Sequence, residues 1–559
     1  MAEKNFNSDT DTSELRASRL SRRSILKYSL QGAGAVATGS LLTTLPGSRS
    51  VFAAGAASDD RQLVVETTEG KVRGFATDEI VIFKGIHYGA STAGANRFLP
   101  PRKPESWNGV RDMFEYGPSA PQLPAGGGGG RTLPITAGYA YTKTLPVNED
   151  CLVLNVFTPK ADRAKRPVMV WLHGGAFTYG QGGNSVYDGT NLARHHDVVA
   201  VSLNHRLNLF GFMQLEEVAG KEYADSGNAS MLDLIAALQW VHDNISAFGG
   251  DPGNVTIFGE SGGGGKVTAL LAMPKAQGLF HKAIVESGSF IRFMPGEDAA
   301  KNTEKILAEL GLKGNPIQQL QQLPMERLIE VSRDAQWQPV VGGQLLPRHP
   351  FDPTAPEISA EVPMLVGSNE TETTFFLGAD DNLFSLDDAG LRARLKSITG
   401  DATDDIVSVY RKARPNATPS DLFFVITSDQ RIRMGAVTQA ERKASLNRAP
   451  VYAYFFTWKA PIDGGKWRTP HTLELPFVFE TYDKATVTGT GPERTVLGDR
   501  VSGAWAAFAR HGNPNQKGLP QWKPYTPAGR ATMIFDNECR VVNDPNHDEL
   551  QSIRGISRL

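Results

Sequence analysis

The sequence predicts an α/β fold with a large, mostly parallel central sheet flanked by helices, preceded by antiparallel strands. Short apolar runs rich in β-branched and aromatic residues alternate with helical stretches, which is the pattern of buried parallel strands. The first runs after residue 60 are separated only by turns, which favours antiparallel pairing. The chain has 559 residues, 40% hydrophobic and 21% charged, a composition typical of a globular protein.

The predicted elements follow one another along the chain in this order. The N-terminal antiparallel strands are expected at residues 62–66, 71–75 and 79–88. The strands of the main sheet are expected at 152–157, 168–172, 198–203, 255–258, 364–367 and 451–456. Helices are expected at 231–242, 301–310, 422–446 and 499–511. No internal repeat or break in composition marks a second domain, so residues 57–559 are expected to form a single domain.

The first 56 residues are predicted to be a cleaved export signal. Residues 21–27 (Ser-Arg-Arg-Ser-Ile-Leu-Lys) match the twin-arginine pattern, and a weakly apolar stretch at 28–45 precedes the cleavage-site-like Ala54-Gly55-Ala56. We therefore expect export by the twin-arginine route to a bacterial periplasm or medium. The alternatives are a disordered basic arm or, if cleavage fails, a membrane anchor. Several glycines make the stretch a poor membrane helix, so no stable membrane insertion is expected after cleavage.

Charge and cysteine content argue against a nucleic-acid partner, a disulfide framework and a metal site. Residues 1–56 carry a net charge of +3, which leaves −5 for the remainder of a chain whose total is −2. This balance predicts no nucleic-acid partner. Two cysteines, Cys151 and Cys539, do not make a disulfide framework. Because the C-x-x-C and H-E-x-x-H spacings are absent, no metal and no cofactor is predicted.

The clearest chemical motif is Gly259-Glu260-Ser261-Gly262-Gly263. It follows a predicted strand and precedes an apolar stretch, 267–273, that can continue as a helix. This is the setting of a G-x-S-x-G nucleophile elbow, whose tight turn needs small residues two positions either side of the serine. Glycines at 262–265 each cost roughly 0.5–1 kcal/mol against alanine in a helix. Four in a row predict a close approach by other backbone.

A second motif, His173-Gly174-Gly175-Ala176-Phe177, directly follows the strand predicted at 168–172. Acyl transfer builds negative charge on a carbonyl oxygen, and one preorganised N–H donor stabilises that charge by about 3 kcal/mol. A glycine-rich loop upstream of the elbow is the usual supplier, together with the N–H that follows the nucleophile. The pair of motifs predicts an oxyanion hole.

A serine nucleophile of this kind needs an acid and then a histidine downstream. Five histidines follow Ser261: His281, His349, His471, His511 and His547. His471 is favoured because it lies in the loop after the strand at 451–456, where such sites form. His349 remains possible from spacing alone. Glu370 and Glu372 both follow the strand at 364–367, and local chemistry does not choose between them.

Taken together, these motifs and others in the same order resemble the type-B carboxylesterases of the cholinesterase-like family, which have the α/β-hydrolase fold. The resemblance spans about residues 60–540. Its further motifs are Arg97-Phe98 with Pro100-Pro101, Asn148–Leu152 (NEDCL), Asn204–Leu207 (NHRL), Ala237–Val241 (ALQWV), Phe248–Pro252 (FGGDP), Phe508-Ala509 and Gly512–Pro514 (GNP).

The resemblance implies a serine hydrolase that cleaves small-molecule carboxylic esters without a cofactor. It implies Ser261 as the nucleophile, Glu372 as the acid and His471 as the catalytic histidine. It also implies that the N–H groups of three residues form the oxyanion hole: Gly175, Ala176 and Gly262. Two buried ion pairs, Arg97 with Glu149 and Arg206 with Asp233, are implied as structural.

The sequence departs from the family pattern at several positions. Gly262 stands where alanine is usual, and Ala120 stands where the disulfide partner of Cys151 is usual. The tryptophan that binds choline headgroups is absent near Tyr141, so no dedicated quaternary-amine site is expected. The glycine-rich stretch 121–142 is open to two interpretations, a flexible surface insertion or a mobile rim over the active-site entrance.

Two alternative functions remain beside ester hydrolysis. Leaving-group fit alone separates an esterase from a hydrolase of related acyl bonds, such as amides or carbamates. A non-catalytic binding or adhesion module is disfavoured because all three triad positions hold competent side chains. The sequence does not indicate the acyl-chain preference or the oligomeric state.

Overall fold

The computed structural model describes residues 63–77, 79–123, 139 and 145–556. These residues belong to one compact unit, 58–559. The predicted signal peptide, glycines 126–130 and Tyr141 lie outside the described residues.

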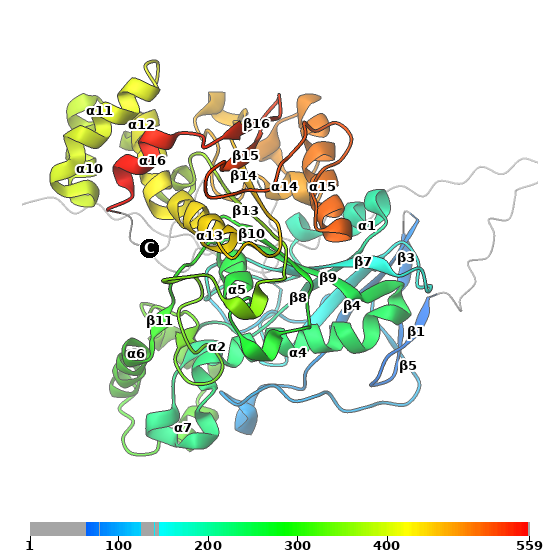
Figure 1. Ribbon diagram of the computed structural model, residues 1–559. Helices are drawn as coiled ribbons and strands as arrows, with labels where there is room; N and C mark the ends of the chain where they lie inside the picture. The colour runs from blue at the N-terminus through cyan, green and yellow to red at the C-terminus, as the bar shows by residue number, and fades with distance from the viewer. Residues whose placement is uncertain (1–62, 78, 124–138, 140–144, 557–559) are drawn as a thin grey trace, which may run out of the picture. The chain divides into compact units, whose positions relative to one another are not determined.

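The main sheet has eleven strands, in the order β16-β15-β14-β13-β10-β9-β7-β8-β6-β4-β3 (Figure 1). The run from β15 to β8 is parallel throughout, and antiparallel strands lie only at the two edges. The predicted fold class is confirmed. The strands of this sheet are β3 (Phe75–Thr77), β4 (Ile80–His87), β6 (Val153–Thr158), β7 (Arg166–Leu172), β8 (Val199–Leu203), β9 (Gly250–Glu260), β10 (Lys282–Glu286), β13 (Met364–Asn369), β14 (Val451–Phe456), β15 (Ala531–Phe535) and β16 (Arg540–Asn543).

Smaller sheets and helices complete the described structure. The short strands are β1 (Val64–Glu66), β2 (Lys71–Arg73), β5 (Val110–Asp112), β11 (Met294–Pro295) and β12 (Val340–Val341). The helices are α1 (Thr190–His196), α2 (Asn208–Phe212), α3 (Glu216–Ala219), α4 (Ala229–Asn244), α5 (Gly262–Leu270), α6 (Gly296–Glu309), α7 (Ile317–Gln322), α8 (Met325–Val331), α9 (Thr373–Leu377), α10 (Asp388–Thr399), α11 (Thr403–Ala413), α12 (Pro419–Ser428), α13 (Met434–Ala444), α14 (Leu475–Val478), α15 (Glu493–His511) and α16 (His547–Ile553).

The central strands are buried on both faces, which explains their uninterrupted apolar sequences. Along β7, Val168 and Val170 belong to one core cluster, while Met169 and Trp171 belong to another. Successive side chains of a strand point to opposite faces, so the two clusters lie on opposite sides of the sheet. Residues of α4 and α5 join the first cluster, and residues of α14 and α15 join the second. Figure 1 shows α4 and α15 on opposite sides of these strands.

Most predicted elements are present, with informative differences. The strand predicted at 71–75 is divided at Gly74, because β2 pairs with β1 and β5 in a small sheet whereas β3 pairs with β4 in the main sheet. The helix predicted at 422–446 is interrupted by a π-helical turn, Asp429–Arg433, between α12 and α13. The strands β10, β15 and β16 of the main sheet were not predicted; β10 has a charged residue at each end, Lys282 and Glu286, so its apolar run is only three residues long.

Two buried ion pairs connect loops to the core. Arg97 Nη2 lies 2.5 Å from Glu149 Oε1, and Arg206 Nη2 lies 2.6 Å from Asp233 Oδ1. All four side chains are at most 7% exposed, and both arginines also donate to backbone carbonyls. Removing one partner would leave a buried charge unpaired, so both pairs are structural.

Cys151 and Cys539 are both free thiols. In the described part of the chain, no helix is long and apolar enough to cross a bilayer. Within the same residues, no group of three or more His, Cys, Asp or Glu side chains is arranged to hold a metal ion.

Candidate active site

Ser261 occupies the turn between β9 and α5. Its φ of +57° and ψ of −124° lie in a region that residues other than glycine rarely adopt. The backbone is held on both sides: the Ser261 N–H donates to the Glu286 carbonyl at 2.8 Å, and the Gly265 N–H donates to the Ser261 carbonyl at 3.0 Å. The side chain remains partly exposed. This is the geometry expected of a nucleophile elbow.

The glycines around Ser261 make room for neighbouring backbone. A Cβ on Gly262 would lie 2.0 Å from the Ala176 carbonyl oxygen, and one on Gly263 would lie 2.0 Å from the Leu172 carbonyl oxygen. A Cβ on Gly259 would lie 2.6 Å from the same Leu172 oxygen. The predicted close approach of backbone is therefore confirmed, and it joins the start of α5 to the loop that follows β7.

That loop presents unoccupied N–H donors. Gly175 and Ala176 have φ values of +89° and +51°. Among the described residues, neither N–H donates to a protein acceptor, and the same is true of the Gly262 N–H at the start of α5. The loop is closed by the N–H groups of Thr178 and Tyr179, which donate to the Gly175 carbonyl at 3.3 and 3.2 Å.

His471 lies in the loop after β14, with its Nδ1 2.6 Å from Glu372 Oε2. The other carboxylate oxygen of Glu372 accepts from the Asn369 N–H and the Ser287 hydroxyl, both at 2.7 Å. Both oxygens are therefore occupied, and both side chains are at most 3% exposed. The hydroxyl of Tyr139, a buried residue of the 121–142 stretch, donates to the His471 carbonyl at 3.0 Å. These contacts leave the imidazole little freedom.

The second ring nitrogen of His471 faces the elbow. Its Nε2 lies 3.0 Å from Glu260 Oε1, and the described residues contain no hydrogen bond between His471 and the Ser261 hydroxyl. A Cβ on Gly174 would lie 3.1 Å from Glu260 Oε2 and 3.5 Å from Ser261 Cβ, so both side chains border the same point. Catalytic hydrogen bonds are often long or misaligned without substrate.

The surrounding charges set the protonation of this imidazole. Burial lowers the pKa of His471, but the carboxylates of Glu260 and Glu372 outweigh it and raise the pKa to about 10. Burial also raises the pKa of Glu260, which the imidazole beside it partly offsets. A histidine with a raised pKa and a carboxyl with a raised pKa therefore lie side by side, next to Ser261.

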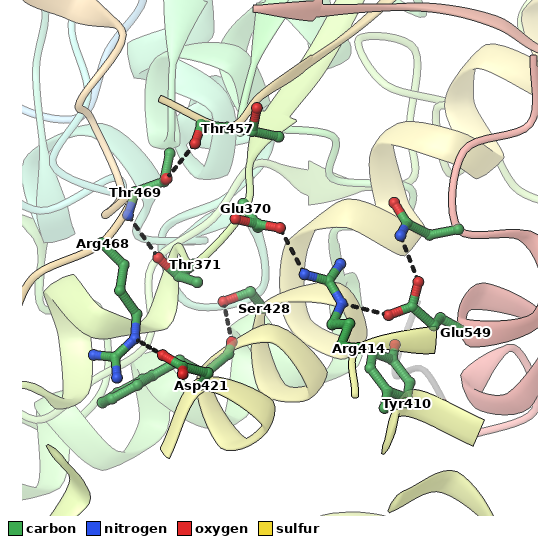
Figure 2. Close-up of polar contacts among 12 residues, drawn as sticks. Glu370, Thr371, Tyr410, Arg414, Asp421, Ser428, Thr457, Arg468, Thr469 and Glu549 are labelled. Atoms are coloured by element: carbon green, nitrogen blue, oxygen red, sulfur yellow. Dashed lines mark hydrogen bonds and ion pairs between the residues drawn. The ribbon is translucent and has the colours of Figure 1, made fainter. Parts of the chain in front are cut away.

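Glu370 and Glu372 face different partners. Figure 2 shows Glu370 directed to Arg414, which also contacts Glu549; the Oε1–Nη1 distance is 2.7 Å and the Arg414 Nε–Glu549 Oε1 distance is 2.5 Å. The loop between the two glutamates is tied to the histidine loop, because the Thr469 N–H donates to the Thr371 hydroxyl at 2.8 Å (Figure 2). Of the two glutamates that the sequence left open, Glu372 contacts His471 and Glu370 contacts Arg414.

Comparison with known proteins places this geometry in a family. The Carboxylesterase family model matches residues 61–553. The chain belongs to the carboxylesterase family. As a member, it is a serine hydrolase of the carboxylic ester class.

Three relatives illustrate how far the likeness extends. The chain is 35% identical over 511 residues to the para-nitrobenzyl esterase of Bacillus subtilis (strain 168), covering 88% of this chain and 98% of the relative. It is 31% identical to the phenmedipham hydrolase of Pseudarthrobacter oxydans, with 88% and 99% covered. A solved carboxylesterase structure from Geobacillus stearothermophilus aligns with a TM-score of 0.76 at 35% identity, covering 88% and 99% of the two chains.

The other downstream histidines of this carboxylesterase lie in other places. His281 Nδ1 accepts from the Val255 N–H at 3.1 Å, and His349 Nδ1 accepts from the Phe293 N–H at 3.2 Å. His547 contacts Asp544, and His511 is the last residue of α15. Spacing alone left His349 open as a candidate, but its ring is engaged with backbone away from both glutamates.

Three buried charged residues of this carboxylesterase were not predicted from the sequence. Glu286 and Glu474 are fully buried; Trp505 Nε1 donates to Glu286 at 2.8 Å and Asn369 Nδ2 donates to Glu474 at 2.5 Å. Burial raises the pKa of Glu286 to about 8. Lys266, in α5, is also fully buried. Glu286 ends an apolar strand and Lys266 follows four glycines. An ionisable residue inside an otherwise apolar or small-residue run is the sequence pattern that could have identified both.

Proposed function

We propose that this carboxylesterase cleaves small-molecule esters through an acyl-enzyme on Ser261, with His471 as general base and acid. Glu372 orients the imidazole and stabilises its cation. The observation that carries this proposal is the arrangement of the ring, with one nitrogen held by Glu372 and the other directed at the elbow. The same pairing of a histidine with an orienting carboxylate activates serine in unrelated hydrolases.

The proposed reaction has two stages. Any proton held between His471 and Glu260 first passes to the Glu260 carboxyl; Nε2 of the neutral imidazole then takes the proton of the Ser261 hydroxyl as the serine oxygen adds to the ester carbonyl. The imidazolium then protonates the departing alcohol, which leaves the acyl group on the serine. In the second stage a water loses its proton to the same nitrogen, adds to the acyl carbonyl, and the acid departs as the proton returns to Ser261.

The tetrahedral oxygen in both stages needs donors. The N–H groups of Gly175, Ala176 and Gly262 are proposed to supply them, because they have no acceptor among the described residues. Donors fixed before the reaction do not need to reorient as charge develops, which is why each stabilises the transition state by about 3 kcal/mol.

Aromatic side chains support an ester with apolar or aryl groups. Phe177 packs edge-to-face against Phe290 and Phe293, with ring centroids 5.7 and 6.0 Å apart, beside the proposed oxyanion loop. Phe376 lies 4.7 Å from the His471 ring, and both it and Phe290 are partly exposed. A relative is named a para-nitrobenzyl esterase. We therefore propose aryl and benzyl esters as first substrates.

A fluorophosphonate probe tests the nucleophile. The probe should label the protein once, and peptide mapping should place the label on Ser261; labelling of another residue would refute the assignment. Ser261→Ala should abolish both labelling and ester turnover while the thermal unfolding midpoint stays close to that of the wild type. Matched p-nitrophenyl esters, anilides and carbamates then rank the acyl bonds, and faster turnover of an anilide or carbamate would replace ester hydrolysis as the preferred reaction.

We also propose that residues 1–56 are a cleaved twin-arginine signal and that 57–559 form the exported enzyme. The support is the Ser-Arg-Arg-Ser-Ile-Leu-Lys stretch at 21–27. Changing Arg22 and Arg23 together to lysine should retain the enzyme in the cytoplasm, as measured by activity in cell fractions. Unchanged export of the double variant would contradict the proposal.

A further inference from the structure

Lys266 is a fully buried lysine on α5, five residues after Ser261. Its Nζ donates to the carbonyl oxygen of His173 at 2.9 Å and to that of Ala176 at 3.1 Å. The same ammonium lies 5.4 Å from the centre of the Phe177 ring. All three contacts are to the loop that follows β7, so one side chain from the nucleophile helix spans this loop.

The two carbonyls bracket the proposed oxyanion donors. The N–H groups of Gly175 and Ala176 belong to the peptides between residues 174 and 176. Lys266 holds the peptide before this pair through His173 and the peptide after it through Ala176. Because peptide units are planar, fixing the flanking peptides restricts how the two between them can rotate. Ala176 also has a positive φ of +51°, a conformation that a residue other than glycine keeps only when its surroundings enforce it.

We propose that Lys266 is a positioning residue for the oxyanion hole, holding the loop so that the Gly175 and Ala176 N–H groups point to one oxygen. The inference rests on the proposed function of this loop.

The chemistry of the position favours this role over a purely structural one. Within the described residues no carboxylate forms an ion pair with Lys266, and Glu260 acts on it only at longer range. The imidazoles of His173 and His205 lie near it; burial and the lysine charge both lower their pKa values, which keeps them neutral. Burial lowers the pKa of Lys266 to about 7, and a buried amine without a carboxylate partner is costly in either protonation state, so stability alone would favour an apolar side chain of the same length. What lysine adds is donation to two carbonyls.

The test replaces Lys266 with methionine, which has similar length and no donor. Lys443→Met is the matched control: Lys443 is 1% exposed on α13 and also donates to two carbonyls, those of Ser359 and Ala360. For each variant we would measure kcat and KM on a p-nitrophenyl ester, affinity for a trifluoromethyl ketone that forms a tetrahedral adduct, and the thermal unfolding midpoint. Rates are expressed per active site, counted by fluorophosphonate labelling.

Lys266→Met should lower kcat by about 10- to 100-fold with KM within about twofold, because only the transition state uses the oxyanion donors. Affinity for the trifluoromethyl ketone should fall by the same factor as kcat/KM, and the unfolding midpoint should not fall. Lys443→Met should leave kcat per site within about twofold of the wild type.

Two results would overturn the inference. One is a kcat per labelled site for Lys266→Met within twofold of the wild type. The other is an equal loss of affinity for the trifluoromethyl ketone and for its planar methyl ketone analogue. If methionine prevents folding, Lys266→Gln keeps a donating nitrogen on a side chain one bond shorter and should give an intermediate kcat; full wild-type kcat there also counts against the role. Absence of label on Ser261 in the wild type would instead refute the proposed function.

Discussion

The two halves of the proposed active site are held together by different kinds of contact. The elbow and the oxyanion loop meet through backbone, with Gly262 and Gly263 so close to facing carbonyls that a Cβ would lie 2.0 Å away. The proposed acid and base meet through side chains, since Glu372 is held by the Asn369 N–H and the Ser287 hydroxyl and in turn holds His471. We therefore expect the first half to be sensitive to added atoms and the second to changes in hydrogen-bonding chemistry.

The largest expected loss of kcat/KM distinguishes Glu372 from Glu370. Glu372→Gln should lower kcat/KM by about 10⁴-fold, because an amide neither favours the required tautomer nor stabilises the imidazolium. Steady-state kinetics on a p-nitrophenyl ester would measure the loss.

Glu370→Gln is the matched control. It keeps the shape of the side chain and weakens only the pair with Arg414, which retains Glu549. Its kcat/KM should stay within about threefold of the wild type, with a modest fall in unfolding midpoint. The opposite ranking of the two variants would transfer the orienting role to Glu370.

The second-largest loss of activity is expected when a single methyl group is added where the elbow meets the oxyanion loop. Gly263→Ala places a Cβ against the Leu172 carbonyl oxygen, so the strand or the helix must shift. A displacement near 1 Å at a catalytic group costs about 100-fold in rate, and overpacking costs roughly 1–3 kcal/mol of stability. Kinetics and chemical denaturation would report both losses.

Gly296→Ala makes the same change at the first residue of another helix, α6. Its Cβ would meet only the Val341 carbonyl oxygen, at 3.7 Å, an ordinary contact. Activity and stability should both remain near wild-type values. Equal behaviour of the two alanine variants would mean that the close packing at the elbow is not required.

A substitution of Glu260 tests the contact between the two halves. Glu260 raises the pKa of His471, so Glu260→Gln should lower it and make the neutral base available at lower pH. The acidic limb of the kcat/KM profile should therefore move down by about one pH unit or more. A raised histidine pKa stabilises the fold below pH 6.5 and this contribution is lost as the pH rises towards 10, so the stability of the variant should fall less steeply over that range. An unmoved or upward-moving limb would contradict the assigned contact.

The smallest effect on activity is expected from a substitution of the buried Glu286. Burial raises the pKa of Glu286 to about 8, so its carboxyl is protonated at neutral pH and glutamine is a close substitute. A raised carboxyl pKa favours the fold below pH 4.5 and this advantage disappears as the pH rises to 8. Glu286→Gln should therefore leave kcat nearly unchanged and raise the unfolding midpoint at pH 9 relative to the wild type, with little difference at pH 4. Thermal unfolding at the two pH values checks the sign, and a variant less stable at pH 9 would show that Glu286 is ionised in the fold.

The sequence by itself determined the parts of the proposed site that lie within one short, continuous segment of the chain. A strand, a glycine-flanked serine and a helix follow one another at 255–273, and the loop after β7 is equally local. Their chemistry depends on residues that are neighbours in sequence, so pattern and composition were enough. The same holds for the fold class, because buried parallel strands have continuous apolar sequences.

Tertiary structure alone decided which distant side chains meet. Asn369 pairs with Phe456 in the register of β13 and β14, which brings the loops bearing Glu372 and His471 together. Glu370 and Glu372 would share a face in a strand, but β13 ends at Asn369 and Glu372 adopts helical angles at the start of α9, so the two diverge. The reach of Lys266 to the oxyanion loop is likewise set by how α5 packs on β7. Sheet register and helix packing join residues about 100 positions apart, and no local pattern encodes them.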